Sequence, residues 1–166
     1  MSRRNTPLVK AALTALHAIR ADRVFDAASD NCGVIFMLHH VVPEMPKGFA
    51  PNRILKITPE FLELAIDEAR AAGLDFVSMD EAGRRLRQPE GARPFACFTF
   101  DDGYRDNFTY AYPVLKRHNV PFTIYVTPAF ADGDGDFWWL TLEEVIARAT
   151  RISVPLPSGE RAFDTR

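Results

Sequence analysis

The sequence lacks the features that mark membrane, nucleic-acid-binding and disulfide-rich proteins. It has only two cysteines in 166 residues, Cys32 and Cys97, and each lies in an apolar stretch where a small buried thiol is common. The formal net charge of -2 leaves no cationic surplus for a nucleic acid or an anionic membrane. No segment approaches the roughly 20 apolar residues that span a bilayer. We therefore expect a soluble globular protein, and 47% hydrophobic residues suffice for its core.

Residues 1–30 begin with an arginine pair and a partly apolar run, as a signal peptide would. Charged and polar residues interrupt that run, and it has no A-x-A-like end. Its apolar residues instead share one helical face: Leu8, Ala12, Ala15, Leu16 and Ile19. We therefore expect an amphipathic N-terminal helical segment over residues 1–30 and, with no clear signal peptide, a cytoplasmic location.

Residues 31–166 predict one domain in which strands alternate with helices. Three unbroken apolar segments are typical of strands buried on both faces, 32–42, 94–100 and 120–130, and a fourth, shorter strand is expected at 74–79. Helices are expected between them, from the N-cap Thr58 to Gly73, over 80–88 with an interruption at Gly83, and over 107–119. The alternation predicts an α/β fold of parallel strands with right-handed crossovers, as in a barrel or a doubly wound sheet.

The last thirty or so residues predict an aromatic cluster at 137–139 that leads into a helix capped by Thr141, and a hairpin around Ser158 and Gly159. Four strands cannot close the usual parallel barrel, because its eight-stranded form needs ~250 residues. The sequence therefore predicts either an open sheet or an incomplete barrel.

The segment FTFDDGYRDN, residues 98–107, ends an apolar strand with two adjacent carboxylates, Asp101 and Asp102. Adjacent negative charges repel, and side chains at the carboxyl ends of parallel strands converge on the ligand site. One interpretation is that a divalent cation binds one carboxylate while the other acts as a general base. The alternative is that one aspartate caps the following turn and the other is solvated.

These residues resemble a known family. The run from Thr99 to Gly103 is similar to the first motif of the NodB-type polysaccharide deacetylases (carbohydrate esterase family 4). The histidine-ended strand MLHHVVPE, the YRDN extension and the segment YPVLKRHNVPFTIYVTPAF also agree with that family. The resemblance covers roughly residues 33–150, and the combination is more specific than any single motif.

The resemblance implies an incomplete (β/α) barrel of the NodB type that would hydrolyse the acetamide C–N bond of N-acetylated sugars with a divalent metal, commonly zinc. It implies that Asp101 is the general base and Asp102 a metal ligand. Either His39 or His40 is a candidate for a further ligand, since successive strand residues point to opposite faces. Tyr104, Asn107 and Trp138 are candidates for binding the glycan substrate, with a helix-start role open for Asn107 and core packing open for the aromatic cluster 137–139.

The family's metal site also needs a downstream His-(Ser/Thr)-x-x-His motif, which this sequence lacks: its histidines are His17, His39, His40 and His118. A catalytic zinc normally has three protein ligands, so the implied site is incomplete. One hypothesis is the N-terminal portion of a deacetylase, inactive as this chain alone. The alternative is a non-catalytic carbohydrate-binding or structural remnant of the same fold. A phosphoryl-transfer protein is less favoured, because no glycine-rich phosphate loop is present.

Overall fold

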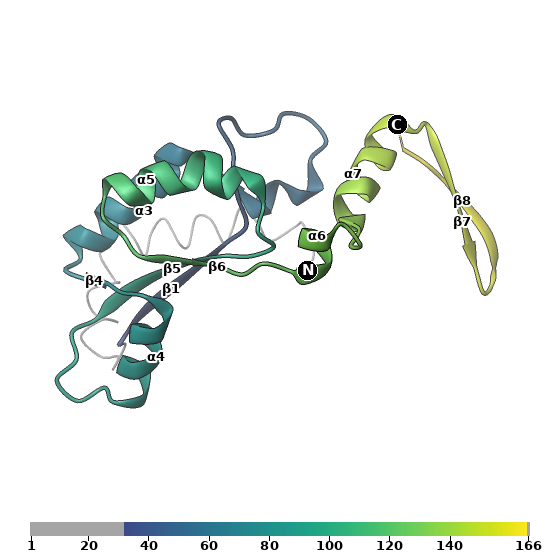
Figure 1. The fold of residues 1–166 in the computed structure, drawn as a ribbon. Coiled ribbons are helices and arrows are strands. Elements are labelled where there is room, and N and C mark those ends of the chain that lie inside the picture. Colours follow the sequence, from purple (N-terminus) through teal and green to yellow (C-terminus); the bar gives the residue numbers. More distant parts are fainter. Residues whose placement is uncertain (1–31, 166) are drawn as a thin grey trace, which may run out of the picture. The chain divides into compact units, whose positions relative to one another are not determined.

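The computed structural model describes residues 32–165, and the helix predicted over residues 1–30 lies outside them (Figure 1). The described residues from Gly33 onward fall in one compact unit. Their strands are β1 (Gly33–Leu38), β2 (His40–Val41), β3 (Lys56–Ile57), β4 (Asp75–Phe76), β5 (Phe95–Phe100), β6 (Phe122–Ile124), β7 (Arg151–Leu156) and β8 (Gly159–Asp164). Their helices are the 3-10 helix η2 (Pro51–Leu55), α3 (Pro59–Ala71), α4 (Met79–Arg87), the π-helix η3 (Asn107–Ala111), α5 (Tyr112–Arg117), α6 (Pro128–Asp132) and α7 (Trp138–Arg148).

Strand β5 is the centre of a four-stranded parallel sheet. Strand β1 pairs with β5 along its whole length, from Gly33 opposite Phe95 to Leu38 opposite Phe100. Strand β4 pairs with the start of β5, and β6 pairs with its end. The short strands β2 and β3 form a separate parallel pair, and β7 and β8 form an antiparallel hairpin. The sheet confirms an α/β fold with parallel strands, as the alternating sequence pattern predicts.

All six residues of β5 are buried, because helices cover both faces of the strand. Phe98 and Phe100 belong to a core cluster that includes Leu62 and Ile66 of α3 and Leu115 of α5. Figure 1 shows α3 and α5 on one side of the sheet and α4 on the other. On the α4 side, the Sγ atom of Cys97 lies 3.9 Å from the Sδ atom of Met79. Burial raises the pKa of the Cys97 thiol, which keeps it protonated and apolar.

Helix α3 begins and ends where its sequence signals indicate. Thr58 is the N-cap and accepts a hydrogen bond of 3.2 Å from the N–H of Phe61. Pro59 occupies the first turn, where its missing N–H costs no bond. Gly73 follows the helix with φ of +77°, a conformation that favours glycine.

Several predicted elements are wrong in extent. The predicted strand 32–42 is two strands separated at His39, and β1 is largely exposed instead of buried on both faces. The strand predicted over 120–130 is limited to β6, because α6 starts at Pro128. Helix α4 continues through Gly83 without interruption. Helix α7 begins three residues before the predicted cap Thr141, because the carbonyl of Phe137 already accepts from the N–H groups of Leu140 and Thr141.

None of the helices in residues 32–165 is both long and apolar enough to cross a bilayer.

Replacing Phe98 by Ala tests the buried centre of the sheet. Phe98 is 0% exposed, and its ring stacks on that of Phe36 with the centroids 4.8 Å apart. We expect the free energy of unfolding to fall by about 3–5 kcal/mol, because the variant leaves a cavity. Urea denaturation measures the change. Phe61→Ala is the matched control, since Phe61 is 54% exposed on α3, and an equal loss in both variants would contradict the assignment of the core.

Candidate functional site

The candidate site lies at the carboxyl end of β5. The N–H of Asp101 donates to the carbonyl oxygen of Leu38 at 2.8 Å, which extends the pairing of β1 and β5 by one residue. His39 follows Leu38, so this register places it next to Asp101. The Nε2 atom of His39 lies 3.9 Å from Oδ2 of Asp101, with side chains that are 21% and 30% exposed. The carboxylate of Asp101 and the imidazole of His39 are therefore close to each other and accessible to solvent.

The chain reverses direction immediately after Asp101. Asp102 and Gly103 both have φ of +67°, in the left-handed region. For an L-residue this conformation costs roughly 1–2 kcal/mol, and aspartate tolerates it better than most. A Cβ atom at Gly103 would lie 3.2 Å from Cγ2 of Val126, so glycine suits both the conformation and the space. The turn gives the adjacent aspartates different surroundings, because Asp102 lines a cavity that Asp101 does not line.

His40 is buried, with 7% exposure, and is held by Asp106. Its Nδ1 atom is 2.6 Å from Oδ2 of Asp106, while Oδ1 of the same carboxylate accepts from the N–H of Val41 at 3.3 Å. The Nε2 atom of His40 has no hydrogen-bond partner among the described residues. A carboxylate on one ring nitrogen fixes the imidazole orientation and leaves the other nitrogen for a ligand or a proton.

Asn107 is 1% exposed and contacts both His39 and Asp106. In the amide orientation that satisfies both side-chain atoms, its nitrogen donates to the carbonyl oxygen of His39 at 2.8 Å and to Oδ1 of Asp106 at 3.2 Å. Its side chain therefore contacts the backbone that carries the histidines. Its predicted role in substrate binding stays a prediction.

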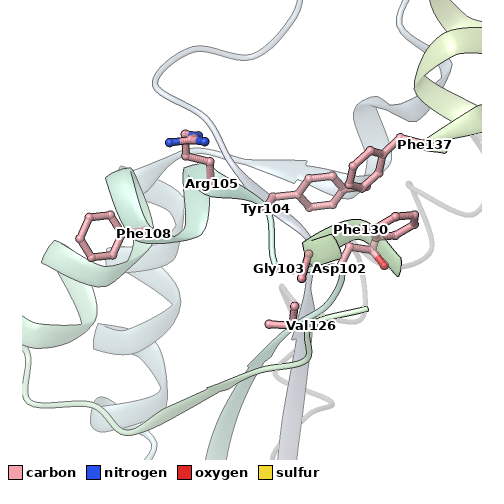
Figure 2. A pocket seen from close by; sticks show the side chains of 9 residues that line it. Asp102, Gly103, Tyr104, Arg105, Phe108, Val126, Phe130 and Phe137 are labelled. Atoms are coloured by element: carbon pink, nitrogen blue, oxygen red, sulfur yellow. The ribbon is translucent and has the colours of Figure 1, made fainter. Parts of the chain in front are cut away.

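A cavity of about 510 Å³ opens beside Asp102. Its lining is mostly aromatic and apolar: Asp102, Gly103, Tyr104, Arg105, Phe108, Val126, Phe130, Ala131 and Phe137. Figure 2 shows the rings of Tyr104 and Phe137 next to each other, and Arg105 pointing away from Asp102. Flat aromatic rings beside a carboxylate can receive the apolar face of a sugar ring.

Tyr104 connects this cavity to the histidines. Its ring stacks on that of His40 with the centroids 3.6 Å apart, and its hydroxyl accepts a hydrogen bond of 3.1 Å from Nε1 of Trp139. Burial, with hydrogen bonding to Asp102 and the charges of Asp102 and Asp106, raises the pKa of Tyr104 to about 12, although the Trp139 N–H acts in the opposite direction. The phenol therefore keeps its proton throughout the neutral range.

Helix α7 is joined to η2 by two hydrogen bonds. The N–H of Asn52 donates to Oε2 of Glu143 at 3.0 Å, and its side-chain amide donates to the carbonyl oxygen of Trp139 at 3.1 Å. The second bond therefore fixes the backbone of Trp139, whose Nε1 donates to the hydroxyl of Tyr104. Trp138 is 65% exposed and is not among the residues that line the cavity. Its predicted contact with substrate stays a prediction.

The two histidines also border a smaller cavity of about 130 Å³. Its remaining lining residues are apolar: Met37, Leu38, Ile54, Leu55 and Ile57.

The described residues do not make a complete metal site. Residues 32–165 contain no group of three or more His, Cys, Asp or Glu side chains placed to hold one ion. Asp102 and the unpartnered Nε2 of His40 have the chemistry of metal ligands, but a catalytic zinc normally takes three protein ligands.

Sequence reasoning did not identify Asp106, which orients His40. Its signal was present in the YRDN extension, where it precedes Asn107. The sequence pattern also gives no sign that Val126 and Phe130 line the cavity, because it predicts one long strand over residues 120–130.

The comparisons with known proteins agree with the motif. Residues 88–151 match the family model described as polysaccharide deacetylase. That segment includes Asp101, Asp102, Tyr104 and Asn107. The match confirms the resemblance to polysaccharide deacetylases that the sequence motif indicates. No curated protein sequence matches the chain.

Three solved structures are similar. The Streptococcus pyogenes deacetylase PplD, in complex with acetate, is 27% identical, with 55% of this chain and 41% of that chain covered and a TM-score of 0.44. IcaB from Ammonifex degensii is 26% identical, with 58% and 38% covered and a TM-score of 0.47. A de-N-acetylase from Aggregatibacter actinomycetemcomitans is 16% identical, with 80% and 45% covered and a TM-score of 0.48. The chain spans less than half the length of each of these structures.

Substitutions at Asp102 test its left-handed conformation. Asp102→Gly is expected to change the free energy of unfolding by less than about 0.5 kcal/mol, and Asp102→Ala to be about 1 kcal/mol less stable than the glycine variant. Chemical denaturation measures both. The neighbouring pair Asp101→Gly and Asp101→Ala is the control, because Asp101 has no positive φ. There the alanine variant should be at least as stable as the glycine variant, and the same order at both positions would contradict the turn geometry.

Proposed function

We propose that this chain is part of a metal-dependent polysaccharide deacetylase that hydrolyses the acetamide C–N bond of N-acetylated sugars. The proposed fold is an incomplete (β/α) barrel of the NodB type. One observation carries the proposal. The adjacent carboxylates Asp101 and Asp102 lie at the carboxyl end of β5, inside the segment that matches the deacetylase family, with His39 beside them.

Amide hydrolysis needs a base that takes a proton from water and an acid that protonates the leaving nitrogen. We assign the base to Asp101, whose carboxylate is accessible at the strand end. Water that loses a proton to Asp101 attacks the acetyl carbonyl carbon, the C–N bond breaks, and acetate and a free amine leave. As the acid we propose the His39 imidazole, because its Nε2 atom lies 3.9 Å from Oδ2 of Asp101.

A divalent metal, zinc in the proposal, would stabilise the negative charge that develops on the carbonyl oxygen. Asp102 is the proposed ligand, with His40 as a second candidate because its Nε2 has no partner in the part of the chain that the structure describes and Asp106 holds its Nδ1. Two ligands are fewer than such a site needs, so these residues do not fit the metal by themselves.

The substrate side of the proposal rests on the aromatic cavity. Tyr104 and Phe137 border it next to Asp102, with ring centroids 5.3 Å apart. A sugar ring stacked there would lie next to Asp102, which also lines the cavity. The hydroxyl of Tyr104 keeps its proton and can donate to a substrate oxygen.

Asp101→Asn tests the base in the polypeptide encoded by the complete reading frame. We expect acetate release from N-acetylated oligosaccharides to fall at least about 100-fold, because the amide cannot accept the proton from water. Metal content should stay unchanged. Asp164→Asn is the control, since Asp164 is exposed on the β7–β8 hairpin, and it should keep the wild-type rate. A near-normal rate for Asp101→Asn would remove Asp101 from the role of base.

The 166-residue polypeptide alone is expected to retain no stoichiometric zinc after dialysis and to release no acetate from chito-oligosaccharides. The reason is the short ligand set among its described residues. Elemental analysis and an acetate assay measure the two outcomes. Tight one-to-one zinc binding, lost in Asp102→Asn, would contradict the expectation. Absence of acetate release from the complete product as well would favour the alternative, a non-catalytic carbohydrate-binding remnant.

A further inference from the structure

The helix that follows Gly103 contains one wide turn. The N–H of Tyr112 donates to the carbonyl oxygen of Asn107, five residues earlier, and the segment Asn107–Ala111 is π-helical. Regular α-helical geometry resumes in α5. Wide turns of this kind are rare and need a local cause, and they occur frequently at functional sites.

Pro113 supplies the local cause. It has no N–H, and in an unbroken α-helix its ring would collide with the carbonyl of the residue four positions earlier, Thr109. Pro113 instead occupies the first turn of α5, where no N–H bond is required. The wide turn thus lets a proline sit between two helical segments without a clash.

The wide turn changes which side chains face the histidines. Val114 and Leu115 are buried in the core and fix the rotation of α5. Each α-helical residue turns the chain by about 100°, and the wide turn accommodates one extra residue. The residues before it are therefore displaced by about one position, or about 100°, from where an unbroken α-helix would put them.

Asp106 and Asn107 make their contacts only in this displaced position. Oδ2 of Asp106 lies 2.6 Å from Nδ1 of His40, and the Asn107 amide nitrogen lies 2.8 Å from the carbonyl oxygen of His39. A rotation of about 100° about the helix axis would move both side chains off these partners. The two contacts join the start of this helical segment, which precedes α5, to the backbone that carries His39 and His40.

We propose that Pro113 is a positioning residue of this site, which through the wide turn sets Asp106 and Asn107 against the two histidines. The inference rests on the proposed function in so far as the histidines serve the deacetylase reaction. Pro113 itself touches no reacting group. Its role is to select the helix geometry in which His40 is held at Nδ1.

The 166-residue chain allows a direct test by NMR of the imidazole nitrogens. In the wild type, we expect a proton signal from Nδ1 of His40, because this nitrogen lies 2.6 Å from Oδ2 of Asp106. In Pro113→Ala the turn can relax to α-helix, and we expect this Nδ1 proton signal to be lost. His118, which lies 2.8 Å from Glu63, is the internal reference and should not change. Pro59→Ala at the start of α3 is the matched control, and should keep the His40 signal.

A rescue variant makes the test independent of folding defects. Deleting the exposed Thr109 in the Pro113→Ala background removes the extra residue, so a regular α-helix should again present Asp106 and Asn107 to the histidines. We expect the His40 signal to return. If Pro113→Ala alone fails to fold, the His40 signal of the double variant tests the proposal. Retention of the signal in the single variant, or failure of the double variant to restore it, would overturn the proposal.

An activity measurement separates this inference from the proposed function. In the product of the complete reading frame, Pro113→Ala should lower kcat tenfold or more with little change in KM, and the Thr109 deletion should restore kcat. An unchanged kcat would count against the positioning role. If the wild-type product releases no acetate, the proposed function fails, while the NMR result still decides whether Pro113 sets the His40–Asp106 contact.

Discussion

The parallel pairing of β1 with β5 is the constraint on which the site depends. The two strands are in register from Gly33 opposite Phe95 to Leu38 opposite Phe100, and both end at the same edge of the sheet. The first residue past each end is a candidate functional residue, His39 on one strand and Asp101 on the other. A slip of one residue would turn the histidine to the opposite face of the sheet. The buried phenylalanines of β5 prevent such a slip, because they are fixed between helices on both faces.

A second constraint comes from the ten residues 98–107, which supply both the acids and the side chains that hold the facing strand. The chain leaves β5 at Asp101, reverses at Asp102 and Gly103, and enters a helix whose first turn carries Asp106 and Asn107. The side chains of Asp106 and Asn107 contact the segment that carries His39 and His40. Polar contacts therefore join residues 98–107 to the end of β1, while apolar contacts join β5 to the core. We expect loss of either the polar or the apolar contacts to displace His39 and His40.

Sequence reasoning predicted the features that local chemistry determines. The capping residues around Thr58 and the unbroken apolar run of β5 each identify an element without knowledge of its neighbours. The position of Asp101 and Asp102 at a strand end follows from that run. The break at His39 could not be read from the apolar pattern, because it depends on β2 leaving β1 to pair with β3. The partnership of Asp106 with His40 joins residues 66 positions apart, so it follows from register and helix rotation and not from spacing.

The backbone reversal also answers the electrostatic question that the adjacent aspartates raise. Repulsion between neighbouring carboxylates suggests a cation shared by both, but the left-handed turn gives them different neighbours. Asp101 lies beside the His39 imidazole, whereas Asp102 lines the aromatic cavity near Tyr104. A general base needs a carboxylate that is free to accept a proton, whereas the carboxylate of a metal ligand is occupied by the metal. Two carboxylates with separate surroundings can take these separate roles, so the strained conformation of Asp102 is consistent with the division of labour in the proposed reaction.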